Sequence, residues 1–410
     1  MKRLLYDKIR ARIDDKRYII ITGPRQVGKT TIMKQLYDDL INKYQNVFFI
    51  SLENPTIYNI LNEHPENLFK YVTKPPEMVK DVSEKYYVFI DEIQYLENPS
   101  NFLKYNYDMY SHTFKLVVSG SSAFYTDKKF DDSLAGRKWL YNMMTMSFEE
   151  FLFFRGYNDL IPELKKIRFS GSDYSIVLNQ LYVLLDEYIS YGGYPAVVLE
   201  KNTDEKKNIL YEITNTFVKR DVLESGIAEE EKLLNLMKLL AQNPGSFMNY
   251  NSYAKTLKVS PHTIENYIYT LRKCFHIHLL KPYFTNIGKS IRKMSKCYFN
   301  DTGFRNSLAN DFRNISNRQD KGHLFENYVF TRLRDFNNPD NIYFWRTSDG
   351  NEIDFLIENN YRQGNAYEVK FDGTEYNKNK YSLFMKNYPA YILNGISYNG
   401  ANNTKSGLNI

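Results

Sequence analysis

Residues 23–30 read Gly-Pro-Arg-Gln-Val-Gly-Lys-Thr. The apolar residues 18–22 precede this stretch, and residues 30–40 follow it with the spacing of a helix. Between a strand and a helix, Gly-x-x-x-x-Gly-Lys-Thr forms a loop whose backbone N–H groups and helix N-terminus surround phosphate oxygens. We expect Lys29 to reach the β- and γ-phosphates of a bound nucleotide, and Thr30 to offer its hydroxyl to Mg²⁺. The stretch therefore predicts a P-loop nucleotide-binding domain.

The expected nucleotide contacts come from the whole loop and the residue after it. They are Gly23, Pro24, Arg25, Gln26, Val27, Gly28, Lys29, Thr30 and Thr31.

A second apolar stretch, residues 86–90, ends in the carboxylates of Asp91 and Glu92. This is the Walker B pattern that accompanies a phosphate-binding loop. We expect Asp91 to hold Mg²⁺, directly or through water, and Glu92 to polarise the attacking water. The second carboxylate argues for hydrolysis of the nucleotide rather than binding alone.

A third apolar stretch, residues 115–119, ends in Ser119-Gly120-Ser121-Ser122. A hydroxyl at this edge of the sheet can orient the lytic water, and Ser119 is the first candidate, with Ser121 next. Arg137 follows in Leu-Ala-Gly-Arg, and a guanidinium suits the charge that spreads over a transferring phosphate. Arg137 is expected to act either on the nucleotide of its own chain or on that of a neighbour.

Length and composition limit the class of protein. At 410 residues the chain is long enough for two to four domains, and 43% apolar with 25% charged residues is usual for a globular protein. A net charge of +6 is too mild to indicate nucleic-acid binding. Two cysteines cannot form a disulfide framework, the apolar runs are too short to span a membrane, and no secretory signal is visible. We expect a cytoplasmic protein without a membrane partner.

The pattern changes along the chain. Up to about residue 155 short strands alternate with helices, which predicts a parallel sheet. Residues 156–244 read as helices, interrupted by Gly192-Gly193-Tyr194-Pro195. Residues 245–305 read as helix, turn, helix and β-hairpin, which together make a winged helix. Residues from about 306 to 320 look like a polar linker, and the Gly/Asn/Ser-rich end from Ser397 is expected to fray.

The C-terminal block combines Glu326 on a predicted helix, Asp354 on a predicted strand, and Glu368 and Lys370 two residues apart on the next strand. Two carboxylates and a lysine that converge across a hairpin can hold Mg²⁺ and activate water against phosphate. We expect Glu326, Asp354 and Glu368 as metal ligands and Lys370 as a catalytic group. The pattern resembles that of PD-(D/E)XK nucleases. Alternating charge on a half-exposed hairpin is the simpler alternative.

The winged helix has two interpretations that the sequence leaves equal. Its second helix, from Ser260 to Cys274, is expected either to contact bases in the major groove or to belong to an element that packs on the nucleotide domain as a regulator. The side chains that favour DNA contact are His262, Thr263, Asn266, Tyr267, Arg272, Lys273, Lys281, Lys289, Arg292, Lys293 and Lys296. His276 and His278, which alternate on the following strand, are expected to be structural.

Taken together, these motifs resemble the AAA-type ATPases of bacteria and archaea that carry an uncharacterised C-terminal half. The resemblance rests on residues 23–31, on Phe-Ile-Asp-Glu-Ile-Gln at 89–94, and on Met-Ser-Phe-Glu-Glu-Phe at 146–151. It implies ATP rather than GTP. This family is in turn similar to the signal-transduction ATPases, in which a Gly-x-Pro turn sits near the adenine. The resemblance implies that Pro195 contributes to the nucleotide pocket.

The expected fold is α/β, with a P-loop ATPase domain at 1–155, a helical lid at 156–244, a winged helix at 245–305 and a restriction-endonuclease-like domain at 315–400. The expected cofactors are ATP and Mg²⁺. The first functional hypothesis is an ATPase that acts on nucleic acid, DNA rather than RNA. In this hypothesis the chain is an ATP-regulated nuclease, and a homo-oligomer is the expected assembly. The alternative is a nucleotide-dependent signalling switch whose C-terminal domain only binds a partner.

Overall fold

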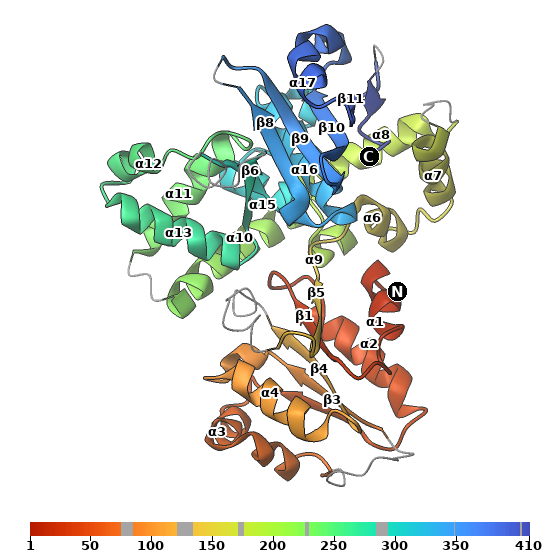
Figure 1. Cartoon of the computed structure of the whole chain (residues 1–410), viewed down its shortest axis with the longest axis vertical. Helices are drawn as coiled ribbons and strands as arrows, with labels where there is room; N and C mark the ends of the chain where they lie inside the picture. The colour runs from red at the N-terminus through yellow and green to blue at the C-terminus, as the bar shows by residue number, and fades with distance from the viewer. Residues whose placement is uncertain are drawn as a thin grey trace. The chain divides into compact units, whose positions relative to one another are not determined.

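The computed structural model describes residues 1–74, 85–120, 134–170, 176–225, 229–283, 294–347, 349–401 and 404–410. The chain divides into two compact units (Figure 1). The first comprises Met1–Met144 and Lys273–Phe275, and the second comprises Thr145–Arg272 and His276–Ile410.

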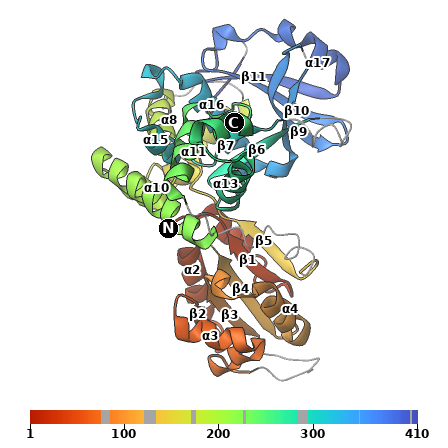
Figure 2. The ribbon, with the colours of Figure 1, turned by 90° about the vertical axis from the view of Figure 1, so that its left-hand side faces the viewer.

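The first unit is built on a five-stranded parallel sheet in the order β2-β3-β4-β1-β5 (Figure 2). The strands are β1 (Tyr18–Thr22), β2 (Val47–Ser51), β3 (Tyr86–Asp91), β4 (Phe114–Gly120) and β5 (Lys138–Asn142). The helices are α1 (Leu4–Arg10), α2 (Lys29–Ile41), α3 (Pro55–Glu63) and α4 (Pro99–Tyr110). The predicted parallel sheet is confirmed. Strand β5, an edge strand in which polar and apolar residues mix, was not predicted.

Both faces of this sheet are covered, which explains why its central strands are almost continuously apolar. On one face Ile20, Val88 and Leu116 pack with Phe102 and Leu103 of α4. Helix α2 packs on the strands from the other side. The carboxyl ends of β1, β3 and β4 therefore lie next to one another at one edge of a rigid layer, where the side chains that follow them meet.

The second unit contains a mixed sheet and many helices, most of which precede its strands in the sequence. Its helices are α6 (Phe148–Phe154), α7 (Leu160–Ser170), α8 (Leu178–Tyr191), α9 (Pro195–Leu199), α10 (Thr203–Ser225), α11 (Glu230–Gln242), α12 (Tyr250–Leu257), α13 (Pro261–Lys273), α15 (Thr302–Ala309), α16 (Lys321–Phe336) and α17 (Ser382–Asn387). Its strands are β6 (Ile277–Pro282), β7 (Lys296–Phe299), β8 (Ile342–Arg346), β9 (Glu352–Asn360), β10 (Gln363–Lys370), β11 (Tyr391–Ser397) and β12 (Lys405–Ser406).

The seven strands form one sheet in the order β12-β11-β10-β9-β8-β6-β7. Strand β6 pairs with β7 antiparallel and with β8 in parallel. The hairpin predicted as the wing of a separate domain is thus continuous with the strands of the C-terminal block. The structure joins the predicted winged-helix and C-terminal regions through backbone hydrogen bonds, which no local pattern in the sequence indicates.

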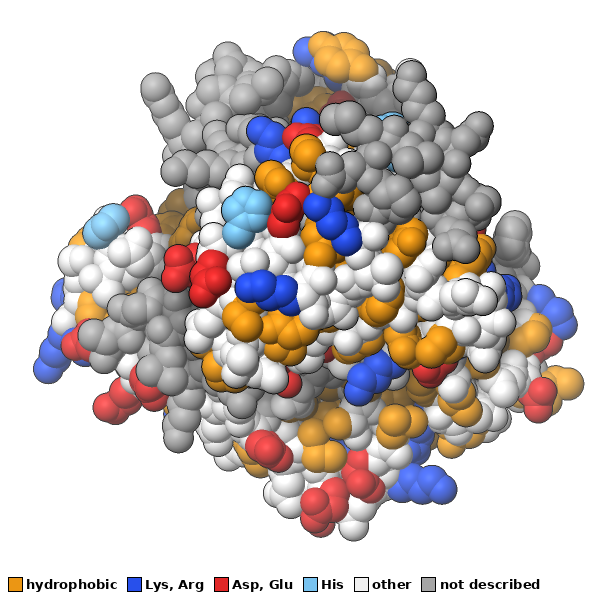
Figure 3. All heavy atoms as spheres, turned by 90° about the horizontal axis from the view of Figure 1, so that it is seen from below, with side chains coloured by type: hydrophobic (Ala, Val, Ile, Leu, Met, Phe, Trp, Pro, Cys, Tyr) orange, Lys and Arg blue, Asp and Glu red, His pale blue; other side chains and the backbone are white. Residues whose placement is uncertain are grey.

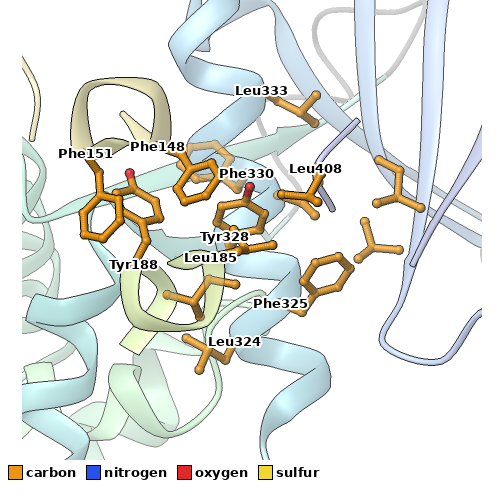
Figure 4. Close-up of a cluster of buried hydrophobic side chains, with 14 of the residues drawn as sticks. Phe148, Phe151, Leu185, Tyr188, Leu324, Phe325, Tyr328, Phe330, Leu333 and Leu408 are labelled. Atoms are coloured by element: carbon orange, nitrogen blue, oxygen red, sulfur yellow. The ribbon is translucent and has the colours of Figure 1, made fainter. Parts of the chain in front are cut away.

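Helix α16 carries the main core of the second unit (Figure 4). Its Phe325 and Tyr328 pack with Leu185 of α8, Phe148 of α6 and Leu408 near the end of the chain. Leu408 is fully buried, and the Tyr328 hydroxyl donates to the Gly407 carbonyl oxygen over 3.0 Å. The end of the chain is therefore anchored in the core. The prediction that the chain frays is wrong for residues 404–410, because Leu408, an apolar residue in a polar stretch, packs in the core around α16.

The predicted linker at 306–320 is also wrong. Residues 302–309 form α15, and Arg305 and Arg318 are buried. Both guanidinium groups pair with Asp320, at 2.6 Å and 2.8 Å. This polar segment can be buried because the two guanidinium groups and the Asp320 carboxylate neutralise one another. Composition alone does not indicate such pairing.

The surface mixes side-chain types. On the face shown in Figure 3, acidic, basic and hydrophobic side chains of the described residues are interspersed rather than gathered by kind. Among the helices within the described ranges, none has the length and hydrophobicity needed to cross a membrane.

Candidate functional site

The loop at residues 23–28 joins the end of β1 to the start of α2. Gly28 has φ +96° and caps α2, a backbone conformation in which a side chain is strained. Gly23 has φ +148°, and a Cβ there would lie 2.0 Å from the Met143 carbonyl oxygen. The two glycines of the motif are thus required by the backbone geometry of the loop and by its close approach to the chain after β5.

Lys29 is buried inside the loop. Its ammonium donates to the carbonyl oxygens of Gly23 and Pro24, over 3.0 Å and 2.7 Å. The side chain therefore points back across the loop, towards the space that the backbone encloses, as a phosphate-binding lysine must.

The other loop residues have varied positions. Val27 is fully buried, whereas Gln26 and Thr31 are exposed, and Gln26 has the left-handed φ of +59°. The carbonyl oxygen of Val27 accepts a hydrogen bond of 2.9 Å from Arg3. Arg3 also donates to the Met144 carbonyl oxygen over 3.0 Å. Arg3 was not predicted as a site residue, since nothing in the motif indicates that the N-terminal segment supports the loop.

Asp91, at the end of β3, is the centre of the site. One carboxylate oxygen accepts the Thr30 hydroxyl over 2.7 Å, and the other accepts the Ser119 hydroxyl. The two predicted Mg²⁺ ligands, Thr30 and Asp91, are therefore in direct contact although 61 residues separate them. A hydroxyl and a carboxylate are the oxygen donors that Mg²⁺ prefers, so these residues fit the ion.

Glu92 follows Asp91 in an unusual backbone conformation. Its φ and ψ are +59° and +49°, the left-handed region that a non-glycine residue rarely adopts. Its N–H donates to Ser119 Oγ over 3.1 Å, and its carboxylate accepts a hydrogen bond from the Gln94 amide. Strain of this kind, of order 1 kcal/mol, is often stored at functional sites.

Ser119 contacts both acidic residues rather than standing apart from them. Its hydroxyl donates to Asp91 and accepts from the Glu92 backbone N–H. We predicted that Ser119 orients the lytic water. The geometry favours a different role, in which Ser119 positions Asp91 and Glu92, the residues expected to hold Mg²⁺ and to polarise water. Ser121, the second candidate, lies outside the described residues.

Ser119→Ala is expected to slow nucleotide turnover by about tenfold, which corresponds to ~1.4 kcal/mol of lost alignment, while ATP affinity changes little. The reason is that Asp91 loses one hydrogen bond and the Glu92 N–H loses its acceptor, each worth about 1 kcal/mol. Phosphate release and nucleotide titration measure the two quantities. Ser51→Ala, at the same edge of the sheet on β2, is the matched control. A loss of affinity as large as the loss of turnover would contradict the positioning role.

Arg137 lies beside the amino-terminal end of β1, whereas the loop follows the carboxyl end of that strand. Its carbonyl oxygen accepts the N–H of Tyr18, the first residue of β1, and its guanidinium pairs with Asp108 at 2.8 Å. Strand β1 separates Tyr18 from the loop by roughly 16 Å. The structure therefore does not bring Arg137 to the phosphates of its own chain. A role on a neighbour's nucleotide stays a prediction.

Pro195 begins α9 in the second unit, after a turn with two tight approaches. The Gly193 N–H donates to the Asp301 carboxylate over 2.8 Å, and the Gly193 carbonyl accepts the Met146 N–H over 2.7 Å. The turn is thus fixed within its own unit. The contribution of Pro195 to a nucleotide pocket stays a prediction.

The C-terminal constellation is assembled around an unexpected partner. Lys370 donates to Glu368 over 2.7 Å, and the Val369 N–H donates to Asp354 over 2.9 Å, so the predicted convergence of β9 and β10 occurs. The Lys296 ammonium, however, lies 3.3 Å from oxygens of both Glu326 and Asp354. No group of three or more His, Cys, Asp or Glu side chains in the described part of the chain is arranged to hold a metal ion.

Burial governs the ionisation of this cluster. It raises the pKa of Glu326 to about 7 against the opposing effect of Lys296, and it raises the pKa of Glu368 to about 7, with Asp354 adding to the shift. Burial alone would lower the pKa of Lys296, but the surrounding carboxylates, Glu326 first, raise it well above its ordinary value. Lys296 therefore keeps its positive charge.

The helix expected to contact DNA is only partly available for that role. Ser260 caps α13 as predicted, its hydroxyl accepting the Thr263 N–H over 3.0 Å. His262, Asn266 and Arg272 are exposed, but Tyr267 is buried in the core. Lys296 is buried as well, so it is not a phosphate contact. Lys289, Arg292 and Lys293 lie outside the described residues.

The two histidines that follow are structural in their contacts. The ring of His276 stacks on Phe304 with centroids 4.8 Å apart, and that of His278 stacks on Phe330 at 5.2 Å. Burial lowers the pKa of His278 to about 3, so this ring is neutral.

Comparison with known proteins adds family relationships. The model of an AAA domain matches residues 15–152, and two models of domains of unknown function match residues 183–316 (DUF8612) and 321–406 (DUF4143). An uncharacterized protein of Methanocaldococcus jannaschii is 30% identical over 348 residues, which cover 82% of this chain and 71% of the relative. An uncharacterized protein of Haemophilus influenzae is 27% identical, over 77% of this chain and 73% of the relative. The structure of the Aeropyrum pernix ORC1 protein in complex with DNA matches with a TM-score of 0.34 and 11% identity, over 75% of this chain and 91% of that chain.

Proposed function

The chain belongs to the family of AAA-domain proteins that includes the uncharacterized protein of Methanocaldococcus jannaschii, and we propose that it binds ATP with Mg²⁺ at residues 23–30 and hydrolyses it. The observation that carries this proposal is the contact network around Asp91. Thr30 and Ser119 both donate to its carboxylate, and Ser119 accepts the N–H of Glu92. Thr30 at the end of the loop, Asp91 and Glu92 thus belong to one hydrogen-bonded unit, which supports the proposal.

Each of these residues has a chemical role in the proposed reaction. Lys29 neutralises charge on the β- and γ-phosphates, and the glycine-shaped loop presents backbone N–H groups to phosphate oxygens. Thr30 and Asp91 would hold Mg²⁺, which when bound neutralises charge that develops on the phosphates. Glu92 polarises the attacking water, with Ser119 fixing the backbone from which its carboxylate projects.

We propose further that the second unit acts on DNA through α12, α13 and the β6–β7 hairpin. Support comes from the exposed side chains of His262, Asn266 and Arg272 on α13, whose N-terminal end is of the kind that reads base edges. Binding as a homo-oligomer would allow Arg137 to reach a neighbour's nucleotide, since its own loop follows the opposite end of β1.

Turnover of ATP tests the proposal. The full chain with Mg²⁺ is expected to release phosphate from ATP above the rate of a buffer blank, and duplex DNA is expected to stimulate that release. Retention of ADP with negligible turnover and no affinity for DNA would instead favour the signalling switch. Failure to bind either ATP or ADP would overturn the assignment of residues 23–30.

A further inference from the structure

A cluster of charged side chains lies between α16 and three strands of the second unit. Its members are Glu326 on α16, Glu352 and Asp354 on β9, Glu368 and Lys370 on β10, and Lys296 on β7. A restriction-endonuclease-like domain would use Glu326, Asp354 and Glu368 to hold a divalent cation. Lys296 has no counterpart in that scheme.

Lys296 makes three ion pairs at once. Its ammonium lies 3.3 Å from Glu326, 3.3 Å from Asp354 and 2.5 Å from Glu352. The contacts with Glu326 and Asp354 are also hydrogen bonds, which use two of the three N–H donors of the ammonium. The side chain is only 4% exposed. The cluster therefore already contains a cation, which is covalently attached to the chain.

The backbone holds Lys296 in this position. In the β6–β7 pairing Lys296 lies opposite Leu280, and on its other side it bridges to Phe247. In this second pairing the Gly245 N–H donates to the Cys297 carbonyl oxygen over 2.7 Å, and the Cys297 N–H donates to the Ser246 carbonyl oxygen over 3.2 Å. The rings of Phe247 and Phe344 lie 6.0 Å and 5.8 Å from the ammonium. Strand pairing on both sides therefore fixes the backbone from which the Lys296 side chain enters the cluster.

Several oxygen atoms of the cluster have further hydrogen-bond partners. Asp354 uses one oxygen for Lys296 and the other for the Val369 N–H. Glu326 accepts the Tyr298 hydroxyl over 2.5 Å on the same oxygen that meets Lys296. One oxygen of Glu368 accepts Lys370 over 2.7 Å, and the other is buried without a hydrogen-bond partner among the described residues. Mg²⁺ requires near-octahedral oxygen ligands at about 2.0–2.1 Å, and it would be repelled by an ammonium that shares the same carboxylates. The residues as arranged do not fit a divalent cation.

We infer that the ammonium of Lys296 takes the place of a divalent cation among Glu326, Glu352 and Asp354, so that the cluster is a closed ion network and not a metal-dependent nuclease centre. The second unit then acts by binding, while catalysis belongs to the first unit. The inference is independent of ATP hydrolysis, because it concerns only contacts within the second unit.

The first arm of the test uses the folded wild-type chain. Binding of Mn²⁺ and terbium to the nucleotide-free full chain is measured for wild type and for Asp354→Asn, by thermal unfolding and by tyrosine-sensitised luminescence. Asn keeps an oxygen for the Val369 N–H. Equal metal responses in the two proteins are expected, because any ion bound in the first unit is common to both. A wild-type response that Asp354→Asn removes would overturn the inference.

The second arm removes the internal cation. Lys296→Met keeps the length of the side chain and is expected to unfold at a lower temperature without metal, because three carboxylates lose their counter-ion. Added Mn²⁺ is expected to raise that temperature and terbium to gain luminescence. Lys281→Met, which alters an exposed lysine on neighbouring β6, is expected to behave as wild type. A folded Lys296→Met chain that gains no metal response would contradict the inference. If that variant does not fold, the first arm still decides.

Discussion

Lys29→Ala is expected to lower the affinity for ATP by at least about 100-fold, while the unfolding temperature of the chain stays close to that of wild type. Charge-assisted hydrogen bonds are worth about 1.5–3 kcal/mol each, and Lys29 is expected to make them to two phosphates. Its ammonium now bonds the Gly23 and Pro24 carbonyl oxygens, so truncation also loosens the loop, at a cost of about 1 kcal/mol. The affinity loss is therefore the larger effect.

Titration with a fluorescent ATP analogue measures the affinity, and circular dichroism on heating checks the fold. Lys34→Ala is the matched control, because Lys34 is an exposed lysine on the same helix, α2. It is expected to bind ATP as wild type does. If Lys29→Ala bound ATP with unchanged affinity, residues 23–30 would not be the nucleotide site.

Glu92→Gln is expected to reduce ATP turnover by about 10²–10³ while ATP binding is kept. Removal of a group that polarises the attacking water costs this much in comparable enzymes. The substitution preserves the size of the side chain and the backbone N–H that donates to Ser119, so the site should remain assembled. The variant is expected to accumulate bound ATP rather than ADP.

Phosphate release under saturating ATP measures turnover, and the nucleotide recovered from the protein identifies what is bound. Glu97→Gln is the control, since Glu97 is exposed five residues along the same segment. Unaltered turnover in Glu92→Gln would remove Glu92 as the water-polarising residue and shift attention to a hydroxyl or a group from a neighbouring chain.

Much of the first unit was predictable because its information is local. The strands at 18–22 and 86–90 are continuous apolar runs, and the glycines and lysine of the loop follow the first at fixed spacing. What could not be predicted was how side chains from different strands bond to one another. Ser119 was expected near the water, yet it contacts Asp91 and Glu92, because strand order places β4 beside β3.

Arg137 shows the opposite case. Its residue type and its position after the third strand favoured a phosphate contact. Strand β5, which was not predicted, begins beside the first residue of β1, at the opposite end of that strand from the loop. An arginine at the start of a parallel strand lies away from the edge at which the ligand site is built. The unpredicted strand thus places Arg137 away from the phosphates of its own chain, whereas its role on a neighbour's nucleotide stays a prediction.

The amino-acid pattern was sufficient to predict the strand, loop and helix around residues 23–30 and the strand that ends at Asp91, since these are set by local apolar runs and by glycines at fixed spacing. It was not sufficient for the second unit. Lys296 lies 30 residues from Glu326 and 58 from Asp354, and it looked like one of several surface lysines. Only the pairing of β7 with β6 and with residue 247 buries it among carboxylates. Burial is a property of the assembled sheet, and it converted an expected metal site into an ion network with its own cation.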